Sequence, residues 1–112
     1  MYFQTVILYC QVNEIPTPQE AESLLLQISE RLSLIAIAPP EVFIYPHPER
    51  AYLIILPIGQ SHLSFETWPE TRTIRILIDS CKEIDVSILK EEIVKYFSTQ
   101  TLKIEEMVTR WP

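Results

Sequence analysis

The spacing of hydrophobic and polar residues divides the chain into eight elements. Apolar residues at helical spacing cover 18–33 and a second segment that begins after Asp85. Short apolar runs with strand character cover 2–12, 42–45, 51–58, 62–67, 73–79 and 101–108. The predicted order is β-α-β-β-β-β-α-β. It favours an α+β fold, a two-layer α/β sandwich in which a mostly antiparallel sheet carries two helices on one face.

Local signals mark where both helices begin. Thr17-Pro18-Gln19-Glu20 offers an N-cap, a proline at the first helical position and a capping-box glutamate. Asp85 is a suitable N-cap for the second helix. Between the helices, prolines exclude helical structure; they stand at 39, 40, 46, 48 and 57.

The segment 62–67 alternates as a strand does. His62 and Glu66 share one face with Ser64, while Leu63, Phe65 and Thr67 share the other. We therefore expect His62 and Glu66 to form a structural pair. The sheet face that the helices leave open needs a cover, and a second copy of the chain would supply one.

Composition limits the classes of function. A chain of 112 residues suits one domain spanning 1–112. The net charge of −6 without a basic stripe argues against nucleic acid or an anionic membrane as the main partner. No apolar run reaches the roughly 20 residues of a transmembrane helix, and the first residues are those of a strand rather than of a signal peptide.

The two cysteines bear on location and on metals. Without an export signal, we expect Cys10 and Cys81 to be reduced thiols of a cytoplasmic protein rather than a disulfide. Two cysteines and two histidines lack the paired spacing of a zinc site, so no metal is expected.

The candidate chemistry lies around the only glycine of the chain. Gly59-Gln60-Ser61 follows an apolar strand, and a lone glycine there indicates a backbone corner. Self-cleavage at a serine uses such a corner: the hydroxyl takes the preceding acyl group, and elimination and hydrolysis then leave a pyruvoyl group. An ordinary turn between two strands explains these three residues equally well, and on them alone it is the better interpretation.

A longer string favours the first interpretation. Ser61-His62 is followed by an alternating strand and by Thr67-Trp68-Pro69-Glu70, and Cys81 comes twenty positions after Ser61. This segment, 59–81, resembles the self-cleaving region of the small bacterial S-adenosylmethionine decarboxylases. The predicted element order is similar to that family over nearly the whole chain.

The resemblance implies a role for each matching position. Ser61 would be the precursor of a pyruvoyl cofactor, cleaved from Gln60, and Cys81 would be the proton donor to the decarboxylated product. Glu70 would hold the ribose hydroxyls of the substrate, and the residue that stacks on adenine would fall at His47. Other interpretations exist: Cys81 as a small buried side chain, Glu70 as a solvated turn residue.

Trp68 is a candidate ligand contact, although a packing role is the better interpretation. The implied ligand is S-adenosylmethionine or a related small molecule. The implied assembly is a homodimer or a dimer with a paralogue.

Three positions depart from the family's pattern. Gln60 replaces a glutamate before the scissile bond. Glu66 replaces the processing histidine, and Leu53 replaces a small hydroxyl residue that assists processing. An exposed carboxylate is a weak base, although burial would make Glu66 a better one.

Three functions follow. The first is a family protein linked to spermidine and polyamine biosynthesis, with impaired or altered self-processing at Gln60–Ser61. The second is a non-cleaving homologue that acts as a ligand-binding or regulatory subunit. The third is a pyruvoyl decarboxylase of another amino acid.

Overall fold

A computed structural model describes residues 1–46 and 51–112, so His47 lies outside the described residues. The elements follow the predicted order. They are β1 (Tyr2–Gln11), α1 (Pro18–Arg31), β2 (Glu41–Ile44), β3 (Tyr52–Ile58), β4 (Ser61–Trp68), the short 3-10 helix η1 (Pro69–Thr71), β5 (Thr73–Ser80), α2 (Val86–Phe97) and β6 (Leu102–Arg110).

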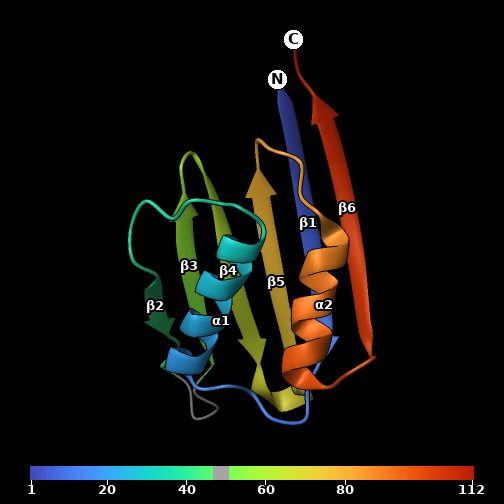
Figure 1. Ribbon diagram of the computed structural model, residues 1–112. Coiled ribbons are helices and arrows are strands. Elements are labelled where there is room, and N and C mark those ends of the chain that lie inside the picture. Colours follow the sequence, from blue (N-terminus) through green and yellow to red (C-terminus); the bar gives the residue numbers. More distant parts are fainter. Residues whose placement is uncertain (47–50) are drawn as a thin grey trace.

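The strands form one sheet in the order β2-β3-β4-β5-β1-β6, and each of the five pairings is antiparallel. Both helices lie on the same face of this sheet (Figure 1). The predicted two-layer α+β sandwich is therefore confirmed. Among the described residues, no helix is long and apolar enough to cross a lipid bilayer.

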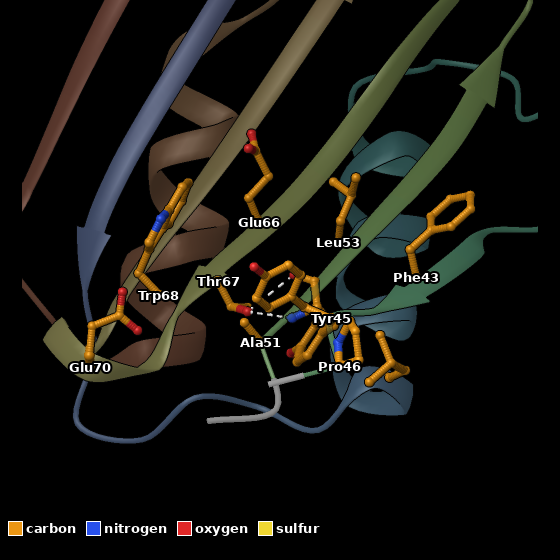
Figure 2. Close-up of a pocket in the computed structure, with 11 residues that line it drawn as sticks. Phe43, Tyr45, Pro46, Ala51, Leu53, Glu66, Thr67, Trp68 and Glu70 are labelled. Carbon is orange, nitrogen blue, oxygen red and sulfur yellow. Dashed lines mark hydrogen bonds between the residues drawn. The ribbon is translucent and has the colours of Figure 1, made fainter. Parts of the chain in front are cut away.

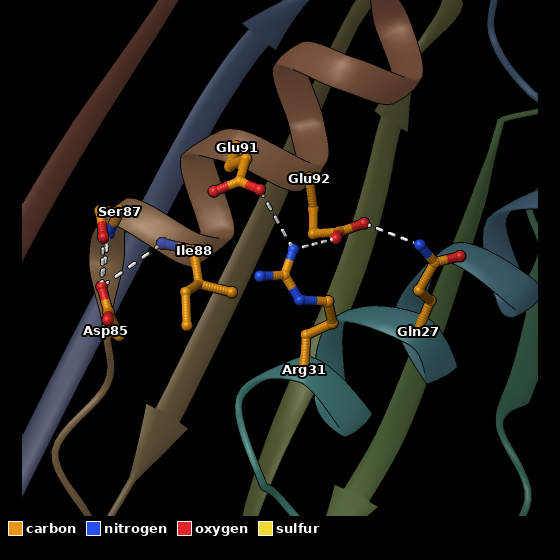
Figure 3. Close-up of polar contacts among 7 residues, drawn as sticks. All are labelled: Gln27, Arg31, Asp85, Ser87, Ile88, Glu91 and Glu92. Carbon is orange, nitrogen blue, oxygen red and sulfur yellow. Dashed lines mark hydrogen bonds and ion pairs between the residues drawn. The ribbon is translucent and has the colours of Figure 1, made fainter.

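Both predicted helix starts are confirmed. The backbone N–H of Glu20 donates to Thr17 Oγ1 at 3.2 Å, and the Thr17 N–H donates to Glu20 Oε1 at 2.9 Å, which completes the capping box. Asp85 Oδ1 accepts from the N–H groups of Ser87 and Ile88 (Figure 3). The first helix ends two residues earlier than predicted, because Ser33 adopts a left-handed φ of 57° that cannot continue it.

The core lies between the helices and the sheet. Leu63, Phe65 and Thr67 of β4 point into it and are buried, whereas on the opposite face His62 and Glu66 are partly buried and the small Ser64 between them is buried. The alternation predicted for this strand is thus confirmed. We call the sheet face opposite the helices the open face, because the described residues place no helix on it.

A polar contact joins the two helices. Glu92, with a side chain only 3% exposed, accepts from Arg31 Nη1 at 2.6 Å and from Gln27 Nε2 at 2.9 Å (Figure 3). Both of its oxygens therefore have partners, which is the condition for burying a carboxylate at an acceptable cost.

Candidate functional site

The turn before Ser61 is a two-residue β-hairpin. Ile58 pairs with Ser61 across it, and Gly59 at its first position has φ of 60°. That conformation is strained for any residue with a β-carbon, so the backbone corner explains why the single glycine stands here. Ser61 is the first residue of β4 and is partly buried.

Cys81 reaches the same end of the sheet from β5. His62 pairs with Asp79 in the register of β4 and β5, and Cys81 is the second residue after Asp79, exposed just beyond the strand. Cys10 is buried in the core, and no disulfide joins the two. We call this group the serine end: Ser61, His62, Asp79 and Cys81.

A cavity lies at the opposite end of β4. It has a volume of about 700 Å³ and lies between β2, β3, β4 and η1 (Figure 2). Its lining consists of aromatic and aliphatic side chains and two carboxylates, from Phe43, Ile44, Tyr45, Pro46, Ala51, Tyr52, Leu53, Glu66, Thr67, Trp68 and Glu70. We call this group the pocket end.

Three predicted site residues therefore meet in this cavity. Glu66 and Trp68 come from β4, and Glu70 comes from η1 directly after it. Leu53 faces Glu66 on the neighbouring strand β3 (Figure 2). Pro46 and Ala51, the described residues on either side of 47–50, both line the cavity.

Two hydrogen bonds between the Thr67 side chain and the Tyr52 backbone join β4 to β3 at the pocket end. Thr67 Oγ1 accepts from the N–H of Tyr52 at 2.9 Å and donates to its carbonyl oxygen at 3.1 Å (Figure 2). The Tyr52 hydroxyl in turn donates to the carbonyl of Pro16 at 2.5 Å. These bonds hold β3, β4 and the start of α1 together behind the cavity.

Glu66 does not pair with His62. Its two oxygens accept from Arg75 Nε at 3.0 Å and from Arg75 Nη2 at 2.8 Å, on the neighbouring strand. The expected His62–Glu66 pair is wrong within one chain, because four residues of extended strand separate these side chains by about 13 Å. Glu66 and Arg75 face each other directly in the β4–β5 register.

Arg75 is held on several sides. Its guanidinium lies 5.3 Å from the Trp68 ring centre and 6.0 Å from that of Tyr9, and the bond to Glu66 raises the pKa of Arg75 above its ordinary value. Both oxygens of Glu66 thus accept charge-assisted hydrogen bonds from Arg75.

Sequence reasoning missed Arg75. The signal was present in the alternation of the strand: Ile74, Ile76 and Ile78 are buried in the core, which leaves Arg75 on the open face with Glu66. What was missing was the strand register that sets the two residues opposite each other.

One copy of the chain does not bring its two ends together. Ser61 and Glu66 are five residues apart in one strand, which corresponds to about 17 Å. The serine end and the pocket end also lie at opposite ends of the sheet in Figure 1.

The comparisons with known proteins agree with this architecture. The family model described as S-adenosylmethionine decarboxylase matches residues 7–110. The chain belongs to the S-adenosylmethionine decarboxylase family. Among solved structures, the adenosylmethionine decarboxylase from Aquifex aeolicus VF5 is similar, with a TM-score of 0.71 and 15% identity over 96% of this chain and 88% of that one. No curated protein matches the chain.

The family assignment confirms the resemblance that the segment 59–81 carried. It leaves the role of each residue as a prediction. Ser61 and Cys81 lie together at the serine end, and Glu66, Trp68 and Glu70 lie together at the pocket end. Among the described residues, no group of three or more His, Cys, Asp and Glu side chains is placed to hold a metal.

Proposed function

We propose that this protein binds S-adenosylmethionine or a closely related adenosyl compound and serves polyamine biosynthesis in the cytoplasm, with impaired self-processing at Gln60–Ser61. Family membership supports the ligand class, and the Glu66–Arg75 pair supports the impaired processing. That pair is the observation on which the proposal depends most.

The cavity suits such a ligand in size and chemistry. A volume of about 700 Å³ lies within the range of small-molecule sites. Trp68 and Tyr45 offer aromatic surface to a base or to a sulfonium, and Glu70 offers a carboxylate to ribose hydroxyls. Glu70 also makes the cavity favourable for a positively charged ligand, whereas Arg75 balances the charge of Glu66.

Two features of the pocket end weaken processing. Glu66 stands where the family has a histidine, and both of its oxygens are bound to Arg75. Leu53, opposite Glu66, has no hydroxyl. A base and a hydroxyl that would assist the attack of Ser61 are thus both replaced.

The residues at the serine end fit a pyruvoyl group. Ser61 follows the turn that exposes the Gln60–Ser61 bond, and Cys81 lies beside it as an exposed thiol. A pyruvoyl group there would supply an electron sink for decarboxylation. Cys81 would donate a proton to the decarboxylated product, and Glu70 and Trp68 would orient the ligand.

A complete site requires two chains, because the serine end of one copy lies far from its own pocket end. A second copy, or a paralogue with a histidine at the position of Glu66, would bring a pocket end to the serine end. We therefore propose a homodimer or a mixed dimer as the functional unit.

The intact mass of the purified protein under denaturing conditions tests the processing claim. We expect one species at 13.1 kDa. Two fragments that meet at Gln60–Ser61 would overturn impaired processing and show an active proenzyme.

A rescue experiment tests the cause. The triple variant Leu53→Ser, Glu66→His and Arg75→Thr supplies the hydroxyl and the imidazole and removes the guanidinium. We expect it to cleave, while the same variant with Ser61→Ala stays intact. A triple variant that folds and remains uncleaved would show that the defect lies elsewhere.

The same pocket favours a second candidate, a non-cleaving ligand-binding or regulatory subunit. Calorimetry separates it from a decarboxylase of another amino acid. We expect saturable heat with S-adenosylmethionine that is lost in Glu70→Ala. A flat titration with this compound and with its decarboxylated analogue would overturn the proposed ligand class.

A further inference from the structure

Arg75 brings a positive charge to two of the side chains that line the cavity. It lies on β5 directly opposite Glu66, and its Nε and Nη2 donate to the two Glu66 oxygens at 3.0 and 2.8 Å. The centre of its guanidinium lies 5.3 Å from the Trp68 ring centre, which is within the range of a cation–π contact. Glu66 and Trp68 both line the cavity (Figure 2).

The two carboxylates of the cavity therefore differ in what they offer a positively charged ligand. Glu66 is neutralised at close range by Arg75, and the side chains of this pair are only 22% and 32% exposed. Glu70 is exposed, so that water and salt screen its charge. Of the attraction that two carboxylates would exert on a cation, only the screened part from Glu70 remains.

Arg75 also changes what Trp68 offers. An indole ring attracts a cation to its face, and here the guanidinium of Arg75 already lies at that ring, with the Tyr9 ring 6.0 Å away on β1. A second cation at the same ring would be repelled by the first. An uncharged aromatic base is not penalised in this way, because it gains from burial and from stacking.

We infer that Arg75 sets the charge preference of the cavity, so that an uncharged adenosyl thioether binds at least as well as a positively charged adenosyl sulfonium. The adenosyl part of this ligand class rests on the proposed function. The inference adds the charge at sulfur. S-adenosylmethionine and S-adenosylhomocysteine are suitable ligands for a test, because they differ by one methyl group and the positive charge that it brings.

Calorimetry with these two compounds measures the preference as the ratio of their dissociation constants. For the unchanged protein, we expect the thioether to bind as tightly as the sulfonium or more tightly. In Arg75→Gln, Glu66 no longer has its counter-ion, and the sulfonium should gain at least about tenfold relative to the thioether. A ratio that does not change in Arg75→Gln would overturn the inference.

Two further variants separate charge from other effects of the substitution. Glu66→Gln with Arg75→Gln removes both charges and should bring the ratio back to within about threefold of the unchanged protein. Arg110→Gln is the matched control. Arg110 lies 5.3 Å from the Tyr2 ring on the edge strand β6, so its loss removes the same charge and the same kind of contact away from the cavity. It should leave the ratio unchanged.

Fluorescence quenching tests the same charge effect without any adenosyl compound. Trp68 is 37% exposed, and Trp111→Phe makes it the only tryptophan of the chain. In that background, Arg75→Gln should raise quenching by caesium at least about twofold and lower quenching by iodide, both at constant ionic strength. Quenching by uncharged acrylamide should change little, which shows that the ring has not become more exposed.

Glu66→Gln provides a test of opposite sign if Arg75→Gln does not fold. It leaves the guanidinium without its carboxylate, so caesium should quench Trp68 less and iodide more than in the unchanged protein. Circular dichroism spectra identify the variants that are folded.

The outcomes separate the inference from the proposed function. A caesium-to-iodide ratio that is the same with and without Arg75, or that shifts equally in Arg110→Gln, would overturn the role of Arg75. An unchanged protein that binds the sulfonium tenfold more tightly than the thioether would overturn the charge preference. Flat titrations with both compounds would refute the proposed ligand class, and the quenching of Trp68 would still decide whether Arg75 sets the charge of the cavity.

Discussion

The ion pairs of Glu92 with Arg31 and of Glu66 with Arg75 differ in what surrounds them. Glu92 lies between the helices, is 3% exposed, and has one oxygen on Arg31 and the other on Gln27. Glu66 lies on the open face at the rim of a cavity and gives both oxygens to Arg75.

The surroundings decide what each pair does. The first is enclosed by α1 and α2 and stabilises their packing. The second lies beside Trp68 and opposite Leu53, at the position where the resemblance to the family predicts a histidine. The first ion pair thus contributes to the fold, whereas under the proposed function the second occupies the carboxylate that replaces a base.

The largest loss of stability should appear when Glu92 is removed. Glu92→Ala leaves Arg31 and Gln27 without their buried partner, and we expect the free energy of unfolding to fall by about 2–3 kcal/mol. Urea unfolding at one protein concentration measures this. Glu91→Ala is the matched control, because Glu91 is 65% exposed and lies 3.5 Å from the same Arg31, and it should cost about 0.5 kcal/mol or less. Equal losses from the two variants would contradict the structural role of Glu92.

The next effect concerns Tyr52 behind the cavity. Burial raises the pKa of Tyr52 above its ordinary value of 10.0, and the negative charge of Glu20 acts in the same direction. The unfolded chain therefore releases this proton at a lower pH than the folded chain. The stability that the protonated hydroxyl contributes is complete below about pH 10 and is lost as the pH rises further.

Tyr52→Phe tests this dependence. The variant should lose about 1–2 kcal/mol at pH 7, because the carbonyl of Pro16 loses its donor, and its stability should then fall less steeply above pH 10. Unfolding curves at pH 8 to 11 measure it, and Tyr45→Phe at the rim is the control. Identical slopes for Tyr52→Phe and the unchanged protein would show that this tyrosine does not titrate as inferred.

The helix-covered side of the molecule was predicted more completely than the open face. The capping box of Thr17 and Glu20, the cap at Asp85 and the alternation of 62–67 are local signals, and the structure confirms them. The early end of α1 was not predicted. The left-handed residue that follows the helix is Ser33, and only a glycine there would have signalled this conformation in the sequence.

The candidate site depends on strand pairing, which local signals do not determine. Glu66 was expected to pair with His62, because both lie on one face, but the β4–β5 register gives it Arg75 instead. The cavity joins residues from three strands and η1, and their meeting depends on the whole sheet. Trp68 and Glu70, which line the cavity, were predicted as ligand contacts because they belong to the sequence segment that resembles the family.

The smallest expected effect is the difference in coupling energy between the two ion pairs. A double-mutant cycle of Glu66→Gln and Arg75→Gln should give a coupling energy of about 1 kcal/mol, since the pair is partly exposed and water screens it. The same cycle on Glu92 and Arg31, with glutamine at both positions, should give about twice that value, because Glu92 is buried. Both cycles are measured by urea unfolding at a single low protein concentration, so that association contributes equally to all variants. A stronger coupling on the open face than between the helices would mean that Glu66 and Arg75 serve the stability of the fold, and the replacement of the histidine would then need no functional explanation.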